Sequence, residues 1–335
     1  MKTSKQCLFS TLFFLACAAL TVFSSTWGTE SNKNLHRSTQ SKSKIESSSE
    51  SHKSSDKPTT MLLGIFSYSK GGDRRNLIRE TYLSTGDERF CSLDDFIEQK
   101  TKYDGPKLIP CQVIYTFIIG GGGKDRPTDH DDSKPLTVST DDNGNSEKDC
   151  TYLNINENME HGKSTTYMKF ASSLAEEYDI DFIGKFDDDA LLGPDVFIDF
   201  IDENLPPAPY NRLIYGGSAR TSRTKNHFYA AGEFYFMSTD LAHWVGHEMG
   251  IHARNKVMIH IEDLDMGSYI HSHPRPIKYI NLFLGSPYFH PLKKESEFRE
   301  HWDLHMDRLS LELPKNGMRI PWICYCKPIL NGYSL

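Results

Sequence analysis

A mostly apolar segment at residues 180–186, which also contains Asp181 and Lys185, leads directly into three consecutive aspartates at residues 187–189. A short apolar run without alternating polar positions is typical of a strand buried on both faces, as in a parallel sheet. Two further runs of this kind occupy residues 61–68 and 112–119, and residues 74–82 between them have helical character. Strand, helix and strand in this order predict an α/β fold with a parallel sheet of the doubly wound kind.

The remainder of the chain continues this pattern. Residues 164–178 carry apolar side chains at the helical period, and shorter mixed strands are predicted at residues 213–215, 233–237 and 277–280. A loop rich in Gly, Asp, Ser and Thr, at residues 124–149, separates the first strands from the helix. The sequence contains no internal repeat, so the body of the chain is predicted to be a single domain.

Composition excludes several classes of protein. The 335 residues are 38% apolar, 12% aromatic and 25% charged, which excludes collagen, wholesale disorder and a polytopic membrane protein. Lys and Arg number 38 against 45 Asp and Glu, giving a net charge of −7, and the body of the chain contains no tract of Lys and Arg. Nucleic acid is therefore not expected as a partner.

The N-terminal segment predicts the secretory pathway. Two lysines precede an almost uncharged apolar segment at residues 7–27. A segment of about 20 apolar residues can span a bilayer, and positive charge before it places the N-terminus in the cytoplasm. We predict a signal anchor at residues 1–27, with a cleavable signal as the alternative. Residues 28–58 contain ten Ser and predict a stem, which leaves the folded domain at residues 59–335.

Five cysteines follow the stem, at positions Cys91, Cys111, Cys150, Cys324 and Cys326. In an oxidising lumen we expect one or two disulfides and, because the number is odd, at least one free or intermolecular thiol. A zinc site is a weaker alternative, since no Cys-x-x-Cys pair is present.

The aspartate run predicts a metal site. In an extended backbone, Asp187 and Asp189 point to one side of the strand and Asp188 points to the other. Adjacent carboxylates repel one another, and a nearby cation offsets that repulsion. Two carboxylates on one side suit a hard divalent ion that keeps positions open for substrate phosphates, which favours Mn²⁺ or Mg²⁺. A solvated acidic turn before the next helix is the alternative.

A second acidic cluster contains Glu262, Asp263 and Asp265 and is followed by Gly267. A carboxylate beside an apolar segment and a glycine turn can act as a general base. An acidic turn that caps the N-terminus of a helix accounts for the same residues. The pattern by itself leaves both interpretations open.

Five segments in chain order resemble motifs of the family 31 β-1,3-glycosyltransferases, which include galactosyltransferases, N-acetylglucosaminyltransferases and Fringe proteins. These segments are residues 75–82, 157–163, 185–189, 229–238 and 262–267. The combination of Lys-x-Asp-Asp-Asp with Glu-Asp-x-x-x-Gly is the most specific part of the resemblance. Two positions depart from the family pattern, because Tyr82 replaces the usual Trp and Ala230 begins Ala-Ala-Gly-Glu where Cys-x-Gly-Gly-Gly is common.

The resemblance implies a GT-A type nucleotide-sugar-binding fold. It implies an inverting transfer of a hexose or N-acetylhexosamine from a UDP-sugar to a hydroxyl of a glycan, glycoprotein or glycolipid acceptor, which leaves a β-1,3 link. It also implies a single-pass type II enzyme of the Golgi or ER membrane with a lumenal catalytic domain. The protein would be secreted if the N-terminal segment were cleaved.

The resemblance also implies residue roles. Asp263 would be the catalytic base, and Asp189 would be a direct ligand of Mn²⁺, with Mg²⁺ as the alternative metal. Asp187 would lie near both the metal and the nucleotide. His290 is our choice among the later histidines to complete the metal site, with a packed surface histidine as the alternative. The other residues predicted to bind the donor are Arg75, Arg79, Lys163, Asp188, Gly232, Glu233 and Glu262.

Two further patterns in the sequence suggest other functions. A His-Gly-Lys-Ser sequence imitates the end of a phosphate loop, but Glu157 stands where the first glycine is required. The pairs His243 and His247, and His301 and His305, have the spacing of a zinc site and would suit a secreted zinc hydrolase, although both lack the Glu of a metalloprotease. A non-catalytic lumenal sugar-binding module on the same fold is the main alternative to an enzyme.

Overall fold

A computed structural model describes most of the chain beyond the predicted stem. The described ranges are residues 57–102, 111–122, 130, 132–160, 162–222, 227–282, 287–310 and 322–326, with only the backbone described for the last range. The predicted anchor, and the predicted stem up to residue 56, lie outside the described residues. Among the helices that the structure describes, none is long and apolar enough to cross a bilayer.

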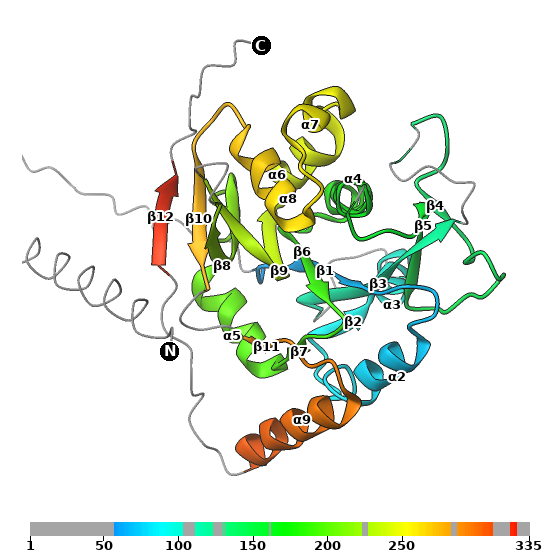
Figure 1. Ribbon diagram of the computed structural model, residues 1–335. Helices are drawn as coiled ribbons and strands as arrows, with labels where there is room; N and C mark the ends of the chain where they lie inside the picture. The colour runs from blue at the N-terminus through cyan, green and yellow to red at the C-terminus, as the bar shows by residue number, and fades with distance from the viewer. Residues whose placement is uncertain are drawn as a thin grey trace, which may run out of the picture. The chain divides into compact units, whose positions relative to one another are not determined.

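The fold is a large, mixed and mostly parallel sheet flanked by helices, consistent with Rossmann-like folds (Figure 1). Within the described residues the sheet has ten strands in the order β12-β10-β8-β9-β6-β1-β3-β5-β4, with β2 beside β3. The strands are β1 Met61–Phe66, β2 Phe90–Ser92, β3 Val113–Gly122, β4 Thr137–Val138, β5 Cys150–Asn156, β6 Phe182–Asp187, β8 Ile214–Thr221, β9 Phe228–Ser238, β10 Ile277–Asn281 and β12 Trp322–Cys326.

Helices cover both faces of the sheet. They are α2 Gly72–Glu80, α3 Leu93–Lys102, α4 Lys163–Tyr178, α5 Pro194–Asn204, α6 Thr239–His243, α7 Ile251–Val257, α8 Glu262–His271 and α9 Glu295–Ser310, with a π-helical turn, η1 Trp244–Glu248, after α6. Side chains of β1 alternate between two apolar clusters because successive residues of a strand point to opposite faces. Leu62 packs toward α3, α4, α6 and α8, whereas Met61, Leu63 and Ile65 pack toward α2, α5 and α9.

The parallel part of the sheet agrees with the sequence prediction. Strands β1 and β3 are parallel and are separated in the chain by α2, and β6 lies parallel to β1 on its other side. The second half departs from the prediction, because β9 is an eleven-residue strand that runs antiparallel to both β6 and β8. The predicted strand at 233–237 is therefore only the second half of β9. Its first half pairs with the end of β8, which local apolar periodicity does not reveal.

One disulfide and one free thiol are present among the described side chains. Cys91 of β2 is bonded to Cys111, which precedes β3, with a Cα–Cα distance of 5.8 Å. Cys150 at the start of β5 is free and partly buried. These observations agree with the expected one or two disulfides and a free thiol, and the side chains of Cys324 and Cys326 lie outside the described residues.

Gly64 in the middle of β1 provides a test of how closely α4 packs on the sheet. A Cβ added at Gly64 would lie 2.5 Å from Cζ of Tyr167, whose hydroxyl donates a hydrogen bond to the carbonyl of Gly184 at 2.9 Å. We therefore expect Gly64→Ala to lower the free energy of unfolding by ~1–3 kcal/mol, as overpacking does in other cores. Urea denaturation measures this loss. Gly250→Ala, where a Cβ meets nothing within 4 Å, is the control, and equal stability of the two variants would contradict the prediction.

Candidate functional site

The site lies at the carboxyl end of β6, a strand with a parallel neighbour on one side and an antiparallel neighbour on the other. Strand β6 pairs with β1 on one side and with β9 on the other, and its last residue, Asp187, lies opposite Phe66 of β1. Ligands of open α/β sheets bind at the carboxyl ends of strands, at points where the order of connection changes. The aspartate run therefore follows the strand at the position where such a fold binds ligands.

A short ribbon brings the third predicted metal ligand to this run. Strand β7 Leu191–Leu192 follows Asp189 and pairs antiparallel with β11 Tyr288–Phe289. Beyond β11, the backbone N–H of Leu292 donates a hydrogen bond to the carbonyl of Asp189 at 2.8 Å. His290 lies between these two connections, so the ribbon carries it to the aspartates from far along the chain.

Asp187, Asp189 and His290 form a cluster suited to a divalent cation. One potential ligand atom of each residue lies within 4.8 Å of the others, and Nε2 of His290 is 3.4 Å from Oδ1 of Asp189. Two carboxylates and one imidazole form a ligand set that suits Mn²⁺, and the small number of protein ligands leaves coordination positions open for substrate oxygens. These are the three residues that the sequence analysis predicts as metal ligands.

Asp188 faces away from this cluster, as the alternation of side chains predicts. Its carboxylate interacts with Ser67, and its buried Oδ2 has no hydrogen-bond partner among the described residues. Burial raises the pKa of Asp188, and the charges of Asp189 and Asp187 raise it further. Since the side chains of Asp187 and Asp189 are also only 22% and 14% exposed, the run is not a solvated acidic turn.

Lys185 is the functional candidate that the sequence analysis missed. Its side chain is 2% exposed, and its ammonium donates hydrogen bonds to Oδ1 of Asp187 at 2.6 Å and to the carbonyl of Gly232. Burial alone would lower the pKa of Lys185, but the carboxylates of Asp187 and Glu262 outweigh it and raise that pKa. The sequence contained one indication of this role, because Lys185 lies two residues before Asp187 and both side chains therefore point to one side of β6.

Glu262 connects the second acidic cluster to Lys185. Its Oε2 lies 3.8 Å from Nζ of Lys185, and its Oε1 accepts hydrogen bonds from the hydroxyls of Ser164 in α4 and Tyr235 in β9, the latter at 2.6 Å. Glu262 is the first residue of α8 and Asp263 is the second. A continuous chain of polar contacts therefore runs from Asp187 to the residue beside the predicted base.

Asp263 lies in a partly buried position beside β9. Its Oδ1 accepts the backbone N–H of Leu264 at 2.8 Å, and a Cβ added at Gly232 would lie 3.7 Å from its Oδ2. Burial raises the pKa of Asp263, and the adjacent charge of Glu262 adds to this effect. A carboxylate with a raised pKa is a stronger base than an ordinary one, which suits proton abstraction.

Asp265, in the same cluster, holds the segment that precedes α8. It is buried, and its carboxylate accepts the backbone N–H groups of Ile259 and His260 at 2.7 and 2.9 Å and that of Ile261 at 3.2 Å. Asp265 therefore holds the turn before α8, whereas the carboxylate of Asp263 interacts with the backbone N–H groups of Leu264 and of Gly232 in β9. The predicted cap of the helix N-terminus is absent, because no described side chain caps α8, and the role of Asp263 as a base stays a prediction.

Two other residues predicted to bind the donor, Glu233 and Lys163, contact other protein groups. Glu233 follows Gly232 in β9 and is near Tyr288 of β11, whose hydroxyl is 3.4 Å from its Oε1. Lys163, at the start of α4, is fully buried and donates hydrogen bonds to the carbonyl of Ser67 and to Oε1 of Glu157, both at 2.6 Å. Burial lowers the pKa of Lys163. Lys163 thus connects the end of β1 to the segment after β5.

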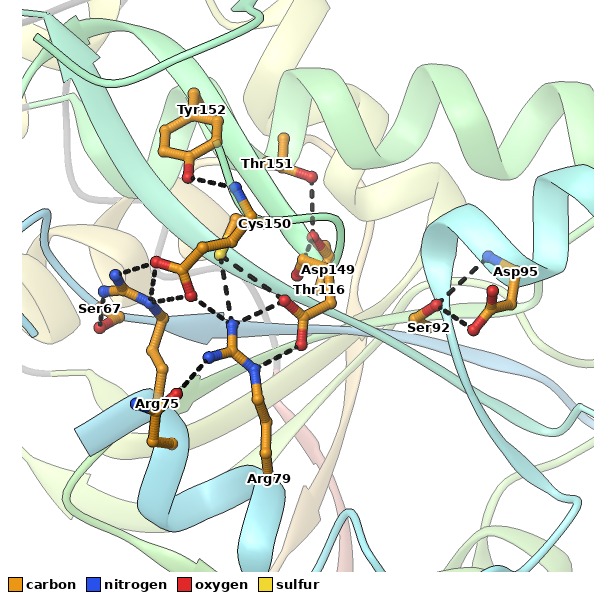
Figure 2. A network of polar contacts seen from close by, with 12 residues as sticks. Ser67, Arg75, Arg79, Ser92, Asp95, Thr116, Asp149, Cys150, Thr151 and Tyr152 are labelled. Carbon is orange, nitrogen blue, oxygen red and sulfur yellow. Dashed lines mark hydrogen bonds and ion pairs between the residues drawn. The ribbon is translucent and has the colours of Figure 1, made fainter. Parts of the chain in front are cut away.

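Arg75 and Arg79 belong to an ion-pair network that involves the acidic segment before β5, and Arg75 also donates a hydrogen bond to the hydroxyl of Ser67 (Figure 2). Both guanidinium groups contact Glu147, and Arg79 also contacts Asp149 through Nη2 at 2.7 Å. The Arg75 side chain is 3% exposed, so these carboxylates offset the cost of burying its positive charge. In this structure the two arginines bind protein carboxylates, and their predicted contact with the donor stays a prediction.

Glu147, Asp149 and Cys150 also cluster closely enough to suggest a metal site. Two arginine cations already contact these carboxylates, and their charge opposes that of a metal ion. Burial, with the charges of Glu147 and Asp149, raises the pKa of the Cys150 thiol to about 12, which disfavours the thiolate form that binds metals. This cluster is therefore a structural network.

Removing one carboxylate from this network should weaken the fold. Hydrogen bonding from Arg75 is the main cause that lowers the pKa of Glu147, so the stabilisation exists above the unfolded pKa of about 4.3 and disappears as pH falls through the folded pKa. We expect Glu147→Gln to cost ~2–4 kcal/mol at pH 7 because Arg75 stays buried. Urea titrations at pH 7 and below pH 4 check this, with exposed Asp142→Asn as control. A loss that is the same at both pH values would contradict the mechanism.

The two histidine pairs with the spacing of a zinc site contact aromatic rings and backbone carbonyls. His243 and His247 stack with ring centroids 4.6 Å apart, and His247 contacts the carbonyl of Lys169. His305 stacks on Trp302, and His301 contacts a backbone carbonyl. Within the described residues, neither pair belongs to a cluster of three potential metal ligands.

No protein-family model matches this chain, and a search of curated proteins gives no significant match.

Proposed function

We propose that this protein is an inverting, metal-dependent glycosyltransferase with a GT-A type fold. It would transfer a hexose or N-acetylhexosamine from a UDP-sugar to a hydroxyl of a glycan acceptor and form a β-1,3 link. One observation carries the proposal, namely that the cluster of Asp187, Asp189 and His290 is joined through Lys185 to the pair Glu262 and Asp263. The sequence motifs that contain the aspartates are the second support.

The proposed reaction needs one proton acceptor and one centre that holds the diphosphate. Asp263 accepts the proton of the acceptor hydroxyl, the oxygen forms a bond to the anomeric carbon, and UDP departs with the electrons of the bond that breaks. A cation bound by Asp187, Asp189 and His290 would supply Lewis-acid stabilisation of the departing diphosphate. Lys185 holds the orientation of Asp187, and its positive charge offsets repulsion among the surrounding carboxylates.

The cellular setting is part of the proposal. The apolar N-terminal segment supports a single-pass type II anchor in the Golgi or ER membrane, with glycoprotein or glycolipid acceptors in the lumen. The Cys91–Cys111 disulfide adds weak support for an oxidising compartment. Cleavage after the apolar segment would release a secreted form.

Release of UDP tests this function. The purified chain is assayed against a panel of UDP-sugars with Mn²⁺, with Mg²⁺ and with a chelator, first without acceptor and then with sugar acceptors. We expect slow hydrolysis of one UDP-sugar that depends on the metal and rises with the right acceptor. Binding of UDP and Mn²⁺ without turnover would identify a sugar-binding module instead. Stoichiometric zinc and activity that survives loss of Asp189 would identify a zinc hydrolase.

A further inference from the structure

Lys293 is a cation beside the metal cluster that neither the motifs nor the proposed reaction uses. Its ammonium forms an ion pair with Oδ2 of Asp189, while His290 faces Oδ1 of the same carboxylate. Each oxygen of Asp189 therefore faces a basic group.

The backbone of Lys293 is held in place, but its side chain is not enclosed. The preceding residue, Leu292, donates its N–H to the carbonyl of Asp189, and the carbonyl of Lys293 accepts a hydrogen bond from Nη2 of Arg74 at 2.6 Å. The Lys293 side chain is 74% exposed. Its ammonium can therefore leave Asp189 without any movement of the backbone.

We propose that Lys293 couples metal binding to donor binding. This inference rests on the proposed function. When the cation approaches alone, the ammonium competes with it for Asp189 and repels it, so Lys293 weakens binding of the free metal. When the cation arrives with a nucleoside diphosphate, the displaced ammonium lies beside two negatively charged phosphates and pairs with them. Lys293 thus favours the metal and the diphosphate together over the metal alone.

This coupling has a thermodynamic signature. If one ligand raises the affinity for a second, the second raises the affinity for the first by the same factor. The ratio of Mn²⁺ affinities with and without UDP measures that factor directly. A group that only supports the fold does not change this ratio in the direction proposed here.

The chain supplies a matched control in the next residue. Lys294 has the same charge and a similar exposure of 75%, but its ammonium pairs with Glu297 of α9 at 2.9 Å. Lys293→Met and Lys294→Met therefore remove the same charge from almost the same place. Lys293→Arg keeps the charge and tests whether the effect is electrostatic.

The experiment measures Mn²⁺ binding to the full chain, without UDP and at saturating UDP, by calorimetry or electron paramagnetic resonance, and it measures UDP binding at saturating Mn²⁺. We expect Lys293→Met to bind Mn²⁺ alone roughly two- to fivefold more tightly, because an ion pair that competes with the metal is gone. UDP affinity should fall roughly tenfold, as for loss of a hydrogen bond to a charged group. Lys293→Arg should restore much of the coupling, and Lys294→Met should match the wild type.

Three outcomes overturn the inference, and the first two leave the proposed function intact. Wild-type binding of Mn²⁺ and UDP together with unchanged affinities in Lys293→Met would remove Lys293 from the site and leave the proposed function intact. The same conclusion follows if Lys294→Met behaves like Lys293→Met, since the effect would then be one of net charge. Failure of the wild-type chain to bind Mn²⁺ or UDP would overturn the proposed function, and this inference with it.

Discussion

Asp189→Asn should abolish Mn²⁺-dependent UDP binding and turnover together while the chain stays folded. The amide is nearly the same size as the carboxylate but carries no charge, so it is a poor ligand for a hard cation. Substitution of residues that only support a metal ligand typically costs 10–100-fold in affinity, so loss of a direct ligand should weaken UDP binding in the presence of Mn²⁺ by at least ~100-fold. Calorimetric titration and steady-state kinetics measure the two losses.

Asp188→Asn is the control for this prediction because it changes the neighbouring carboxylate in the same run. Asp188 faces Ser67 and lies on the other side of the strand from the cluster, so Mn²⁺ affinity should stay within about threefold of the wild type. Circular dichroism confirms that both variants are folded. If Asp189→Asn binds UDP and Mn²⁺ normally, Asp189 is not a metal ligand.

Asp263→Asn, unlike Asp189→Asn, should retain donor affinity while its turnover is strongly reduced. The amide keeps the size of the side chain and its oxygen still accepts the N–H of Leu264, but it cannot accept a proton from the acceptor. Loss of a positioned general base lowers turnover by ~10²–10⁴. Steady-state kinetics combined with a separate measurement of UDP affinity distinguishes this result from that of Asp189→Asn.

The pH dependence of kcat/KM is an independent test of Asp263 as the general base. A base must be ionised to act, so kcat/KM should fall as pH drops through the pKa of Asp263. Because burial and Glu262 raise that pKa, the fall should occur at a higher pH than for an ordinary Asp with a pKa of about 3.9. The residual activity of Asp263→Asn should lack this limb.

The rival carboxylates in the same turn should behave differently from Asp263. Glu262→Gln keeps an acceptor for Ser164 and Tyr235 and should retain much of the activity. Asp265→Asn should act mainly on stability, since the carboxylate caps three backbone N–H groups before α8. Near-normal turnover by Asp263→Asn would show that Asp263 is not the base, whatever the activities of Glu262→Gln and Asp265→Asn.

Local patterns in the sequence were sufficient to predict the central elements of the fold. The apolar runs that became β1, β3 and β6, and the helical periods that became α2 and α4, depend on which side chains recur within a few residues. The position of Asp187 at the end of β6 follows from the same local information. The sides taken by Asp187 and Asp188 follow from the alternation of side chains along an extended backbone.

Contacts between distant segments could not be predicted in this way. The full length of β9 depends on its pairing with the end of β8, and Glu147 meets Arg75 and Arg79 only because the acidic segment folds back beside α2. Hydrogen bonds between strands use backbone groups that every residue except proline has. Local composition therefore carries little information about which distant segment will supply them.

The sequence by itself determined which residues could act as a metal ligand, a base or a buried strand, because those properties belong to side chains and their local spacing. Only the tertiary structure decided which of them meet. The β7–β11 ribbon brings His290 to Asp189, and the buried Lys185 connects Asp187 with Glu262. Asp265, beside Asp263, binds backbone N–H groups of the preceding turn. The physical reason is that burial, charge pairing and backbone hydrogen bonding are satisfied between segments far apart in the chain, and a local pattern does not specify its partner.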